Sequence, residues 1–243
     1  MIPKHGPDRI RAAMHTFANN RSFGLALILA ALLFGFASGP AAAGAVMEKA
    51  PADPDPAKKY FFYMHGGYVE KRGSDSTYDY HSILGALADK GFEIIGEARG
   101  LSHPGRYAKG IAEQVNGLLD KGVPAANIIV GGHSKGGFMT LLTSTMVGRD
   151  DIKYTVLAAC GKKGTPYFKN YRRFINRNAE KLTGKFLVMW DENDQDAGNC
   201  DKAFDKSDTN PTNLILETGK GHQLFYQHEE SWLTPVVAFI NEN

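Results

Sequence analysis

Apolar and polar positions divide this chain into compact apolar runs and longer amphipathic stretches. Compact apolar runs are typical of strands that are buried on both faces of a sheet. They lie at residues 60–64, 92–96, 128–130, 153–159, 185–190 and 213–217. Stretches with apolar residues at helical spacing lie at residues 82–90, 107–121, 138–146 and 232–240. This alternation predicts an α/β fold with a mostly parallel central sheet and helices on both faces, and its site is expected at the carboxyl ends of the strands.

The first 43 residues have the pattern of a secretory signal peptide. A basic segment ends at Arg21, the run 23–36 is wholly apolar or glycine, and small residues follow. This order predicts cleavage after Ala43 or Ala45 and export to the periplasm or the cell exterior. An uncleaved membrane anchor is the alternative, because no charged residue occurs at 22–47 and that length can span a bilayer.

The remainder of the chain reads as a linker followed by one domain. Residues 44–58 are rich in Ala, Pro, Asp and Lys without periodicity, which predicts a linker, and the domain is expected at 59–243. The formal net charge is +2, but residues 1–43 carry +3, which leaves −1 for the rest. This near-neutral body gives no electrostatic reason to expect a nucleic-acid partner.

One segment, 161–184, is strongly basic. Its charged residues are Lys162, Lys163, Lys169, Arg172, Arg173, Arg177 and Lys181, against the single acid Glu180. Aromatic residues at helical spacing are interleaved with these cations. One interpretation is a solvated helix whose aromatic face packs on the domain. The other is a pocket wall that prefers anionic substrates or a negatively charged envelope surface.

The two cysteines, Cys160 and Cys200, each follow a predicted strand on the same side of the sheet. An exported protein folds in an oxidising compartment, where the two could form a disulfide. Two separate buried thiols are the alternative. A disulfide here would restrain the loop that follows residue 190.

The sequence Gly132-His133-Ser134-Lys135-Gly136 forms a GxSxG motif between a predicted strand and a predicted helix. This context is that of a nucleophile elbow, in which a serine is held on a strained turn. The amide of Lys135 and the amino end of the helix would face the space in front of Ser134, where a carbonyl oxygen gains charge during acyl transfer. The competing sequence GLSHP at 100–104 lacks the second glycine, and its proline is expected to exclude a helix start of this kind.

A serine nucleophile requires a base and a group that orients that base. His222 lies in a glycine-bounded loop directly after the last predicted strand, so it is the expected base. For the acid, the loop after residue 190 offers Asp194 first and Asp196 second. Calcium binding by this acidic cluster is the alternative, although its spacing does not fit an EF-hand.

The His65-Gly66-Gly67 sequence follows the first predicted strand, where glycines allow backbone amides to approach a substrate oxygen. Together, HGG after a strand, GHSKGG, an Asp after the penultimate strand and GH before the last helix resemble the α/β-hydrolase fold. The resemblance covers residues 60–243, without a large cap. It implies Ser134 as nucleophile, His222 as base, Asp194 as acid, and the amides of Gly67 and Lys135 as the oxyanion hole.

The sequence departs from that pattern at several points. The family's first two strands are missing or irregular, Asp191 stands where a glycine is common, and Lys135 is unusual beside the nucleophile. The side chain of Lys135 is expected either in solvent or against an acidic group of the substrate.

The main functional hypothesis is an exported serine hydrolase that cleaves small carboxylic esters, anionic ones included, through an acyl-enzyme. The same residues could support an amidase or an acyltransferase. A non-catalytic envelope protein that binds through its basic segment is the alternative from another class. No metal or nucleotide cofactor is implied, because the chain has no P-loop and no paired-histidine metal motif. A membrane is expected as a partner only if the leader is uncleaved.

Overall fold

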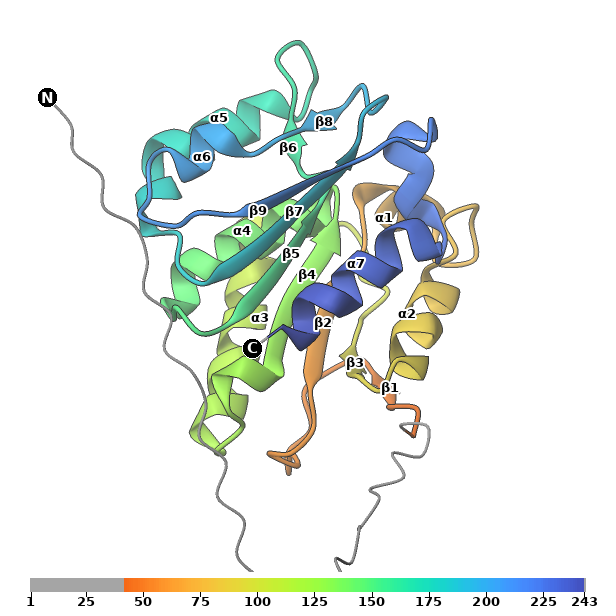
Figure 1. The fold of residues 1–243 in the computed structure, drawn as a ribbon, viewed down its shortest axis with the longest axis vertical. Helices are drawn as coiled ribbons and strands as arrows, with labels where there is room; N and C mark the ends of the chain where they lie inside the picture. Colours follow the sequence, from red (N-terminus) through yellow and green to blue (C-terminus); the bar gives the residue numbers. More distant parts are fainter. Residues whose placement is uncertain (1–41, 243) are drawn as a thin grey trace, which may run out of the picture. The chain divides into compact units, whose positions relative to one another are not determined.

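A central parallel sheet organises the protein in a computed structural model that describes residues 42–242. The sheet has seven strands in the order β1-β3-β2-β4-β5-β7-β9, and every neighbouring pair is parallel (Figure 1). Its strands are β1 Val46–Met47, β2 Tyr60–Met64, β3 Glu93–Ile95, β4 Ile128–His133, β5 Lys153–Leu157, β7 Lys185–Asp191 and β9 Thr212–Leu216. The predicted fold class is thus confirmed.

Helices cover both faces of this sheet (Figure 1). The α-helices are α1 Gly67–Arg72, α2 Tyr80–Asp89, α3 Pro104–Asp120, α4 Lys135–Val147, α5 Phe168–Arg177, α6 Asp201–Phe204 and α7 Glu230–Asn241. Short 3₁₀ helices are η1 Ala125–Asn127, η2 Ala179–Lys181 and η3 Gly221–Tyr226. Helices α3, α4, α5 and α6 contribute to the core on one face, and α2 and α7 to the core on the other. No helix within residues 42–242 is both long and apolar enough to cross a membrane.

Strand β2 illustrates why the apolar runs lack polar alternation. Tyr60, Phe62 and Met64 belong to the hydrophobic core on one face of the sheet. Phe61 and Tyr63 belong to the core on the opposite face. Because successive side chains of a strand point to opposite faces, a strand covered on both sides must be apolar throughout.

The sheet begins earlier in the chain than the sequence predicted. Residues Val46–Met47, within the expected linker at 44–58, form strand β1 and pair with Ile94 and Ile95 of β3. The amide of Gly44 also donates to the carbonyl of Ala88 at 2.8 Å. A strand this short has no detectable periodicity, so only its pairing partner reveals it. The expected signal peptide lies outside the described residues except at its end.

A second correction concerns Pro104. The sequence predicts that this proline excludes a helix start, whereas α3 begins at Pro104. The first position of a helix has no intrahelical acceptor for its amide, and the fixed φ of proline suits that position. Proline therefore starts this helix, although the preceding turn differs from the elbow that contains Ser134.

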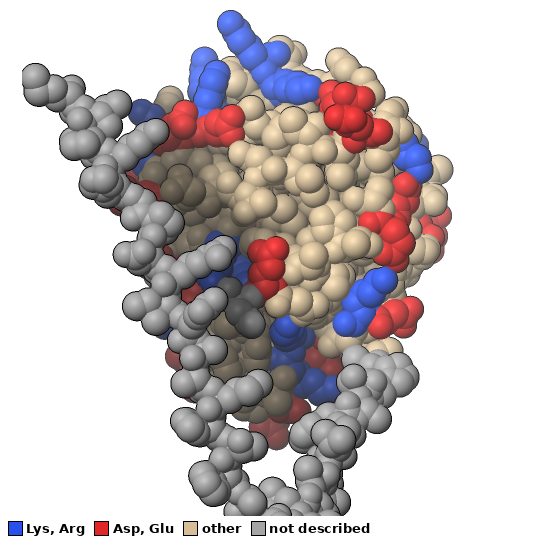
Figure 2. Space-filling view, in the orientation of Figure 1, with Lys and Arg blue, Asp and Glu red and all other residues tan. Residues whose placement is uncertain are grey.

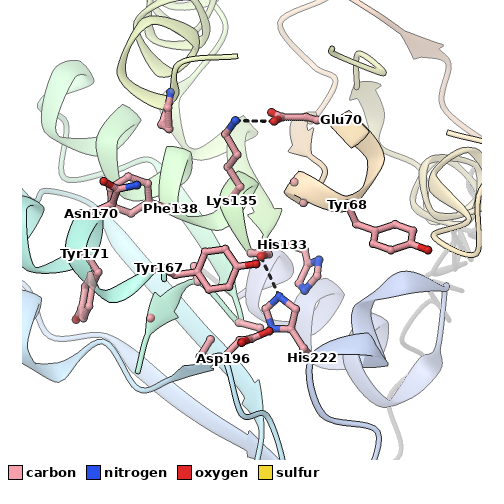
Figure 3. A pocket seen from close by; sticks show the side chains of 18 of the residues that line it. Tyr68, Glu70, His133, Lys135, Phe138, Tyr167, Asn170, Tyr171, Asp196 and His222 are labelled. Carbon is pink, nitrogen blue, oxygen red and sulfur yellow. Dashed lines mark hydrogen bonds and ion pairs between the residues drawn. The ribbon is translucent and has the colours of Figure 1, made fainter. Parts of the chain in front are cut away.

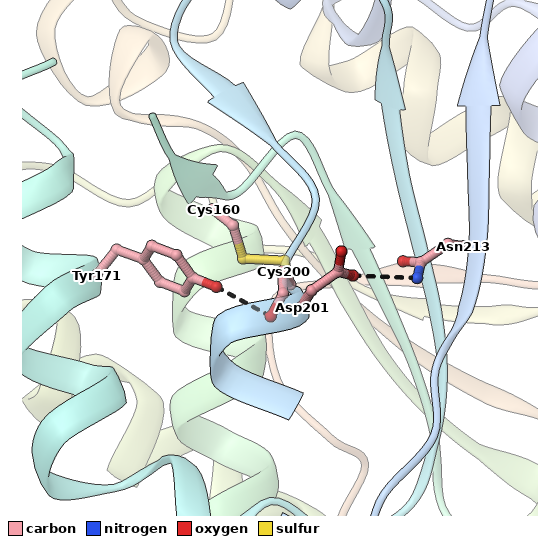
Figure 4. The surroundings of a disulfide bond; sticks show 5 residues. All are labelled: Cys160, Tyr171, Cys200, Asp201 and Asn213. Carbon is pink, nitrogen blue, oxygen red and sulfur yellow. Dashed lines mark hydrogen bonds between the residues drawn. A yellow bond between two sulfur atoms is a disulfide. The ribbon is translucent and has the colours of Figure 1, made fainter. Parts of the chain in front are cut away.

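Cys160 and Cys200 form a disulfide, which settles the alternative left open by the sequence (Figure 4). It joins the two-stranded antiparallel sheet of β6, Cys160–Gly161, and β8, Ala197–Gly198, to the start of α6. The hydroxyl of Tyr171 in α5 donates to the carbonyl of Cys200 at 3.0 Å. The loop between β7 and α6 is therefore attached both to the end of β5 and to α5.

Replacing both cysteines with alanine is expected to lower the free energy of unfolding by about 3 to 4 kcal/mol, because the bridge closes a chain segment of 40 residues and restricts the unfolded state. Urea denaturation of the double variant and the oxidised wild type measures this difference. Equal unfolding free energies would contradict the expectation.

Candidate active site

Ser134 occupies the turn between β4 and α4. Its backbone has φ 55° and ψ −116°, a conformation that residues other than glycine rarely adopt. A Cβ atom on Gly132 would lie 2.3 Å from the carbonyl oxygen of Met64, and one on Gly136 would lie 2.0 Å from the same oxygen. Only glycine at both positions allows the turn to press against the end of β2. This contact places the Ser134 side chain at the carboxyl edge of the sheet.

The loop after β2 packs directly against this turn. A Cβ atom on Gly66 would lie 3.1 Å from Nδ1 of His133 and 3.3 Å from Cβ of Ser134. Gly67 is the first residue of α1, and Lys135 is the first residue of α4. Neither amide has an acceptor within its own helix, because the first turn of a helix leaves its N–H groups unpaired. The two expected oxyanion donors thus lie on contacting segments beside Ser134.

The structure brings Ser134, His222 and Asp194 into one hydrogen-bonded chain. Nε2 of His222 lies 2.9 Å from Oγ of Ser134, and Nδ1 lies 2.8 Å from Oδ2 of Asp194. The Asp194 side chain is fully buried, and its Oδ1 accepts the amides of Asp196 and Ala197 at 2.8 and 2.9 Å. These bonds hold the carboxylate against the imidazole. Asp196, the second candidate, has no such contact with His222 and lies beside it at the pocket wall (Figure 3).

Asp191 at the end of β7 fixes the loop that contains His222. Its carboxylate accepts the amides of Asn193, Thr218 and Gly221, each at 3.0 Å, and the hydroxyl of Thr218 at 2.6 Å. Burial raises the pKa of Asp191, but the hydrogen bond from Thr218 and those from the backbone outweigh it and hold the pKa below its usual value. Asp191 is therefore an ionised anchor between the Asp194 loop and the His222 loop, a role the sequence analysis did not anticipate.

His133, inside the GxSxG motif, packs against His222. The two ring centroids lie 4.6 Å apart, and Phe225 covers another side of His133 at 5.3 Å. Burial, and then the nearby His222, lowers the pKa of His133 well below its usual value. The imidazole of His222 therefore packs against a neutral ring.

Solved structures were found that share this fold at low sequence identity. A Klebsiella pneumoniae protein assigned as a dienelactone hydrolase matches with a TM-score of 0.55 and 11% identity, over 79% of this chain and 90% of that one. Porphyromonas gingivalis dipeptidyl peptidase 4 matches with a TM-score of 0.53 and 17% identity, over 79% of this chain. The protein has the α/β-hydrolase fold. Both neighbours are hydrolases by name, and this chain spans only 32% of the length of the peptidase.

Sequence comparisons add no closer relative to this α/β-hydrolase-fold protein, since no protein-family model and no curated protein sequence matches the chain. At the identities of the structural matches, the likeness establishes the fold alone.

A pocket of about 410 Å³ opens in front of Ser134 in this α/β-hydrolase-fold protein. Its walls include the aromatic side chains Tyr68, Phe138, Tyr167, Tyr171 and Tyr226 and the charged side chains Glu70, Lys71, Lys135 and Asp196. Figure 3 shows the Lys135 side chain extending away from His222 toward Glu70. Their Nζ and Oε2 atoms are 2.5 Å apart. From the sequence, the Lys135 side chain was expected in solvent or against an acidic group of the substrate. In the structure it is instead paired with Glu70 of the same chain.

For the basic segment at 161–184, the sequence left two interpretations open: a helix with a packed aromatic face, and a pocket wall that prefers anions. Tyr171 and Phe174 of α5 are buried, which confirms the packed aromatic face. Tyr167 and Asn170 line the pocket, whereas none of the segment's lysines and arginines does so. The Nζ of Lys162 donates to the carbonyl of Asp194. Other Lys and Arg side chains project outward where α5 and the preceding loop lie (Figure 2). The pocket wall supplied by this segment is therefore aromatic and neutral.

Within residues 42–242, no group of three or more His, Cys, Asp or Glu side chains is placed to hold a metal ion. In the acidic loop, Asp191 and Asp194 are instead occupied by backbone amides, Thr218 and His222. The loop thus uses its buried carboxylates for hydrogen bonding.

Asp191→Asn is expected to lower the free energy of unfolding by about 2 kcal/mol at pH 7, because an amide NH₂ would face backbone N–H donors in a buried site. The folded-state pKa of Asp191 is depressed, so its stabilisation is present above the usual value of 3.8 and is lost as the pH falls through the lowered pKa. Urea denaturation between pH 7 and pH 3 should therefore show the two proteins converging at the acid end. A difference that is independent of pH would contradict an ionised anchor.

Proposed function

We propose that this protein is a serine hydrolase that cleaves carboxylic esters through an acyl-enzyme intermediate. The observation that carries the proposal is the continuous chain from Ser134 Oγ to His222 Nε2 at 2.9 Å and from His222 Nδ1 to Asp194 Oδ2 at 2.8 Å. A nucleophile, a base and an orienting acid in hydrogen-bond contact are the groups that acyl transfer requires. The hydrolase names of the structural neighbours are in keeping with it.

In the proposed reaction, Ser134 Oγ attacks the carbonyl carbon of the ester, and Nε2 of His222 accepts the hydroxyl proton. The carbonyl oxygen becomes an oxyanion that the amides of Gly67 and Lys135 receive, aided by the amino end of α4. As the tetrahedral intermediate collapses, the C–O bond breaks and His222 returns the proton to the departing alcohol. Water, deprotonated by His222, then attacks the acyl carbon. The bond between that carbon and Ser134 Oγ breaks, the carboxylic acid leaves, and His222 returns the proton to Oγ. Asp194 holds the imidazole in orientation throughout.

The pocket favours small acyl or alcohol groups. Its volume of about 410 Å³ and its aromatic walls suit compact apolar parts of a substrate. The ammonium of Lys135, which could have attracted an anionic group, is already paired with Glu70. Short-chain and aryl esters are accordingly the proposed substrates.

Export through a cleaved leader forms part of the proposal. The Cys160–Cys200 disulfide suits an oxidising compartment. The amide of Gly44 donates to Ala88, and the carbonyl of Ala45 accepts from Ile94, both at 2.8 Å. Cleavage after Ala45 would remove these two bonds, whereas cleavage after Ala43 would keep the residues that form them. The favoured mature amino terminus is therefore Gly44.

Mass spectrometry of the protein recovered from the periplasm or medium is expected to show Gly44 as the first residue. Recovery with Val46 first, or in membranes with the leader intact, would contradict this processing.

Wild-type protein is expected to react with a fluorophosphonate at Ser134 and to hydrolyse p-nitrophenyl acetate, and Ser134→Ala should lower turnover by at least about a thousandfold. Peptide mapping locates the label, and a series of p-nitrophenyl esters and p-nitroanilides separates esterase from amidase activity. Parallel assays with an alcohol acceptor detect acyl transfer.

Asp194→Asn and Asp196→Asn form a matched pair for the acid. The first is expected to reduce kcat roughly 10³- to 10⁴-fold, because the imidazole loses its orienting partner, whereas the second should change it by less than about tenfold. A folded protein that neither labels at Ser134 nor hydrolyses esters would favour a binding role for the exposed cations around α5, testable through salt-dependent binding to anionic glycans.

A further inference from the structure

Three charged side chains, Glu70, Arg99 and Lys135, form a network beside Ser134 that the proposed reaction does not use directly. They come from α1, from the loop after β3 and from the start of α4. These segments follow β2, β3 and β4, which are neighbours in the sheet. The network therefore connects loops at the edge where the oxyanion would form.

Glu70 is the centre of this network. Its Oε2 lies 2.5 Å from Nζ of Lys135, and its Oε1 accepts Nε of Arg99 and the hydroxyl of Ser102, both at 2.9 Å. Lys135 also donates to the carbonyl of Ser102 at 2.6 Å. The side chains of Glu70 and Arg99 are each 2% exposed, and that of Lys135 is 24% exposed. These are buried charges with defined partners, unlike exposed ion pairs at a surface.

The Glu70–Lys135 ion pair links the two helices whose first amides are placed to receive the oxyanion. Glu70 lies in the first turn of α1 after Gly67, and Lys135 supplies the second amide itself. The stem of Lys135 also packs over Gly67, since a Cβ atom there would lie 3.7 Å from Cδ of Lys135. A shift of the Lys135 side chain would thus be transmitted to both donors.

Arg99 restrains the other end of the same loop. Its Nη2 donates to the carbonyl of His65, directly before Gly66 and Gly67. The loop that contains Gly67 is consequently held on one side by Arg99 and on the other by Glu70, and Glu70 is bonded to both cations. Without these side-chain contacts, α1 would be joined to the turn at Ser134 only through the packing of Gly66.

A buried network of two cations and one carboxylate is costly to assemble, and apolar residues of similar volume often stabilise a fold equally well. Burial raises the pKa of Glu70, but hydrogen bonds from Lys135 and Ser102 and the charge of Arg99 lower it below its usual value, so the carboxylate is ionised. Such a network is better explained by the geometry that it defines than by stability.

We propose that the Glu70–Lys135 ion pair, braced by Arg99, is a positioning device that sets the separation and direction of the Gly67 and Lys135 amides for the oxyanion. This inference rests on the proposed function. Small displacements of such donors are expensive, because removal of one oxyanion donor typically costs about 10²- to 10³-fold in kcat.

Lys135→Met is the decisive variant. Methionine preserves the aliphatic contact with Gly67, removes the ammonium, and leaves Glu70 and Arg99 as a balanced pair. With p-nitrophenyl acetate, and with active sites counted by fluorophosphonate, kcat is expected to fall about 10- to 100-fold while KM changes less than about twofold. Inhibition by a trifluoromethyl ketone, whose adduct bears an oxyanion, should weaken in parallel, and Lys135→Arg should restore part of both losses.

Lys109→Met is the matched control, because Lys109 forms an exposed ion pair with Glu113 on α3. This variant should leave kcat unchanged. If Lys135→Met does not fold, Glu70→Gln supplies the same readouts with the carboxylate replaced by a neutral amide of equal shape. A variant that melts earlier yet keeps kcat per labelled site would overturn the inference and leave the proposed function standing. Wild-type protein without Ser134 labelling or turnover would overturn both.

Discussion

The close approach of the turn at Ser134 to the end of β2 is the constraint on which the rest of the site depends. Gly132 and Gly136 both face the carbonyl oxygen of Met64, at separations that no side chain could occupy. Because of this contact, the nucleophile and the loop containing Gly67 form one packed unit. Everything else at this edge of the sheet is arranged around it: the charged network reinforces the unit from one side, and the acid and base loops approach Ser134 from the other.

The second half of the site is organised by hydrogen bonds to two buried carboxylates. Asp194 faces His222, and Asp191 bonds to the residues on either side of that contact. The division of labour follows from position, since Asp191 ends β7 and Asp194 lies within the loop. One aspartate thus holds the backbone of two loops, which leaves the other available to orient the imidazole.

Much of this arrangement could be predicted from the sequence, because it depends on local rules. Strands buried on both faces must be apolar. Residues that follow successive parallel strands, including the glycines around Ser134, meet at one edge of the sheet. Strand β1 could not be found this way, since two residues carry no period and its pairing with β3 is a tertiary event. Nor could the Glu70–Arg99–Lys135 network, because charged residues are usually exposed and no sequence spacing joins three separate loops. The role of Asp191 could not be predicted either, because two of its hydrogen-bond partners, Thr218 and Gly221, lie in a different loop.

The disulfide has a consequence for how substrates of different size could be accommodated. Cys160 and Cys200 tie β6 and β8 together, and Gly161 and Ala197 from these strands line the pocket next to Tyr167. The disulfide restrains that wall against outward displacement. Leu101 also lines the pocket and is 80% exposed, in a loop without regular secondary structure that Ser102 attaches to Glu70 and Lys135. A bulkier substrate group must therefore be accommodated by rotation of exposed side chains such as Leu101, because the backbone on both sides of the pocket is restrained.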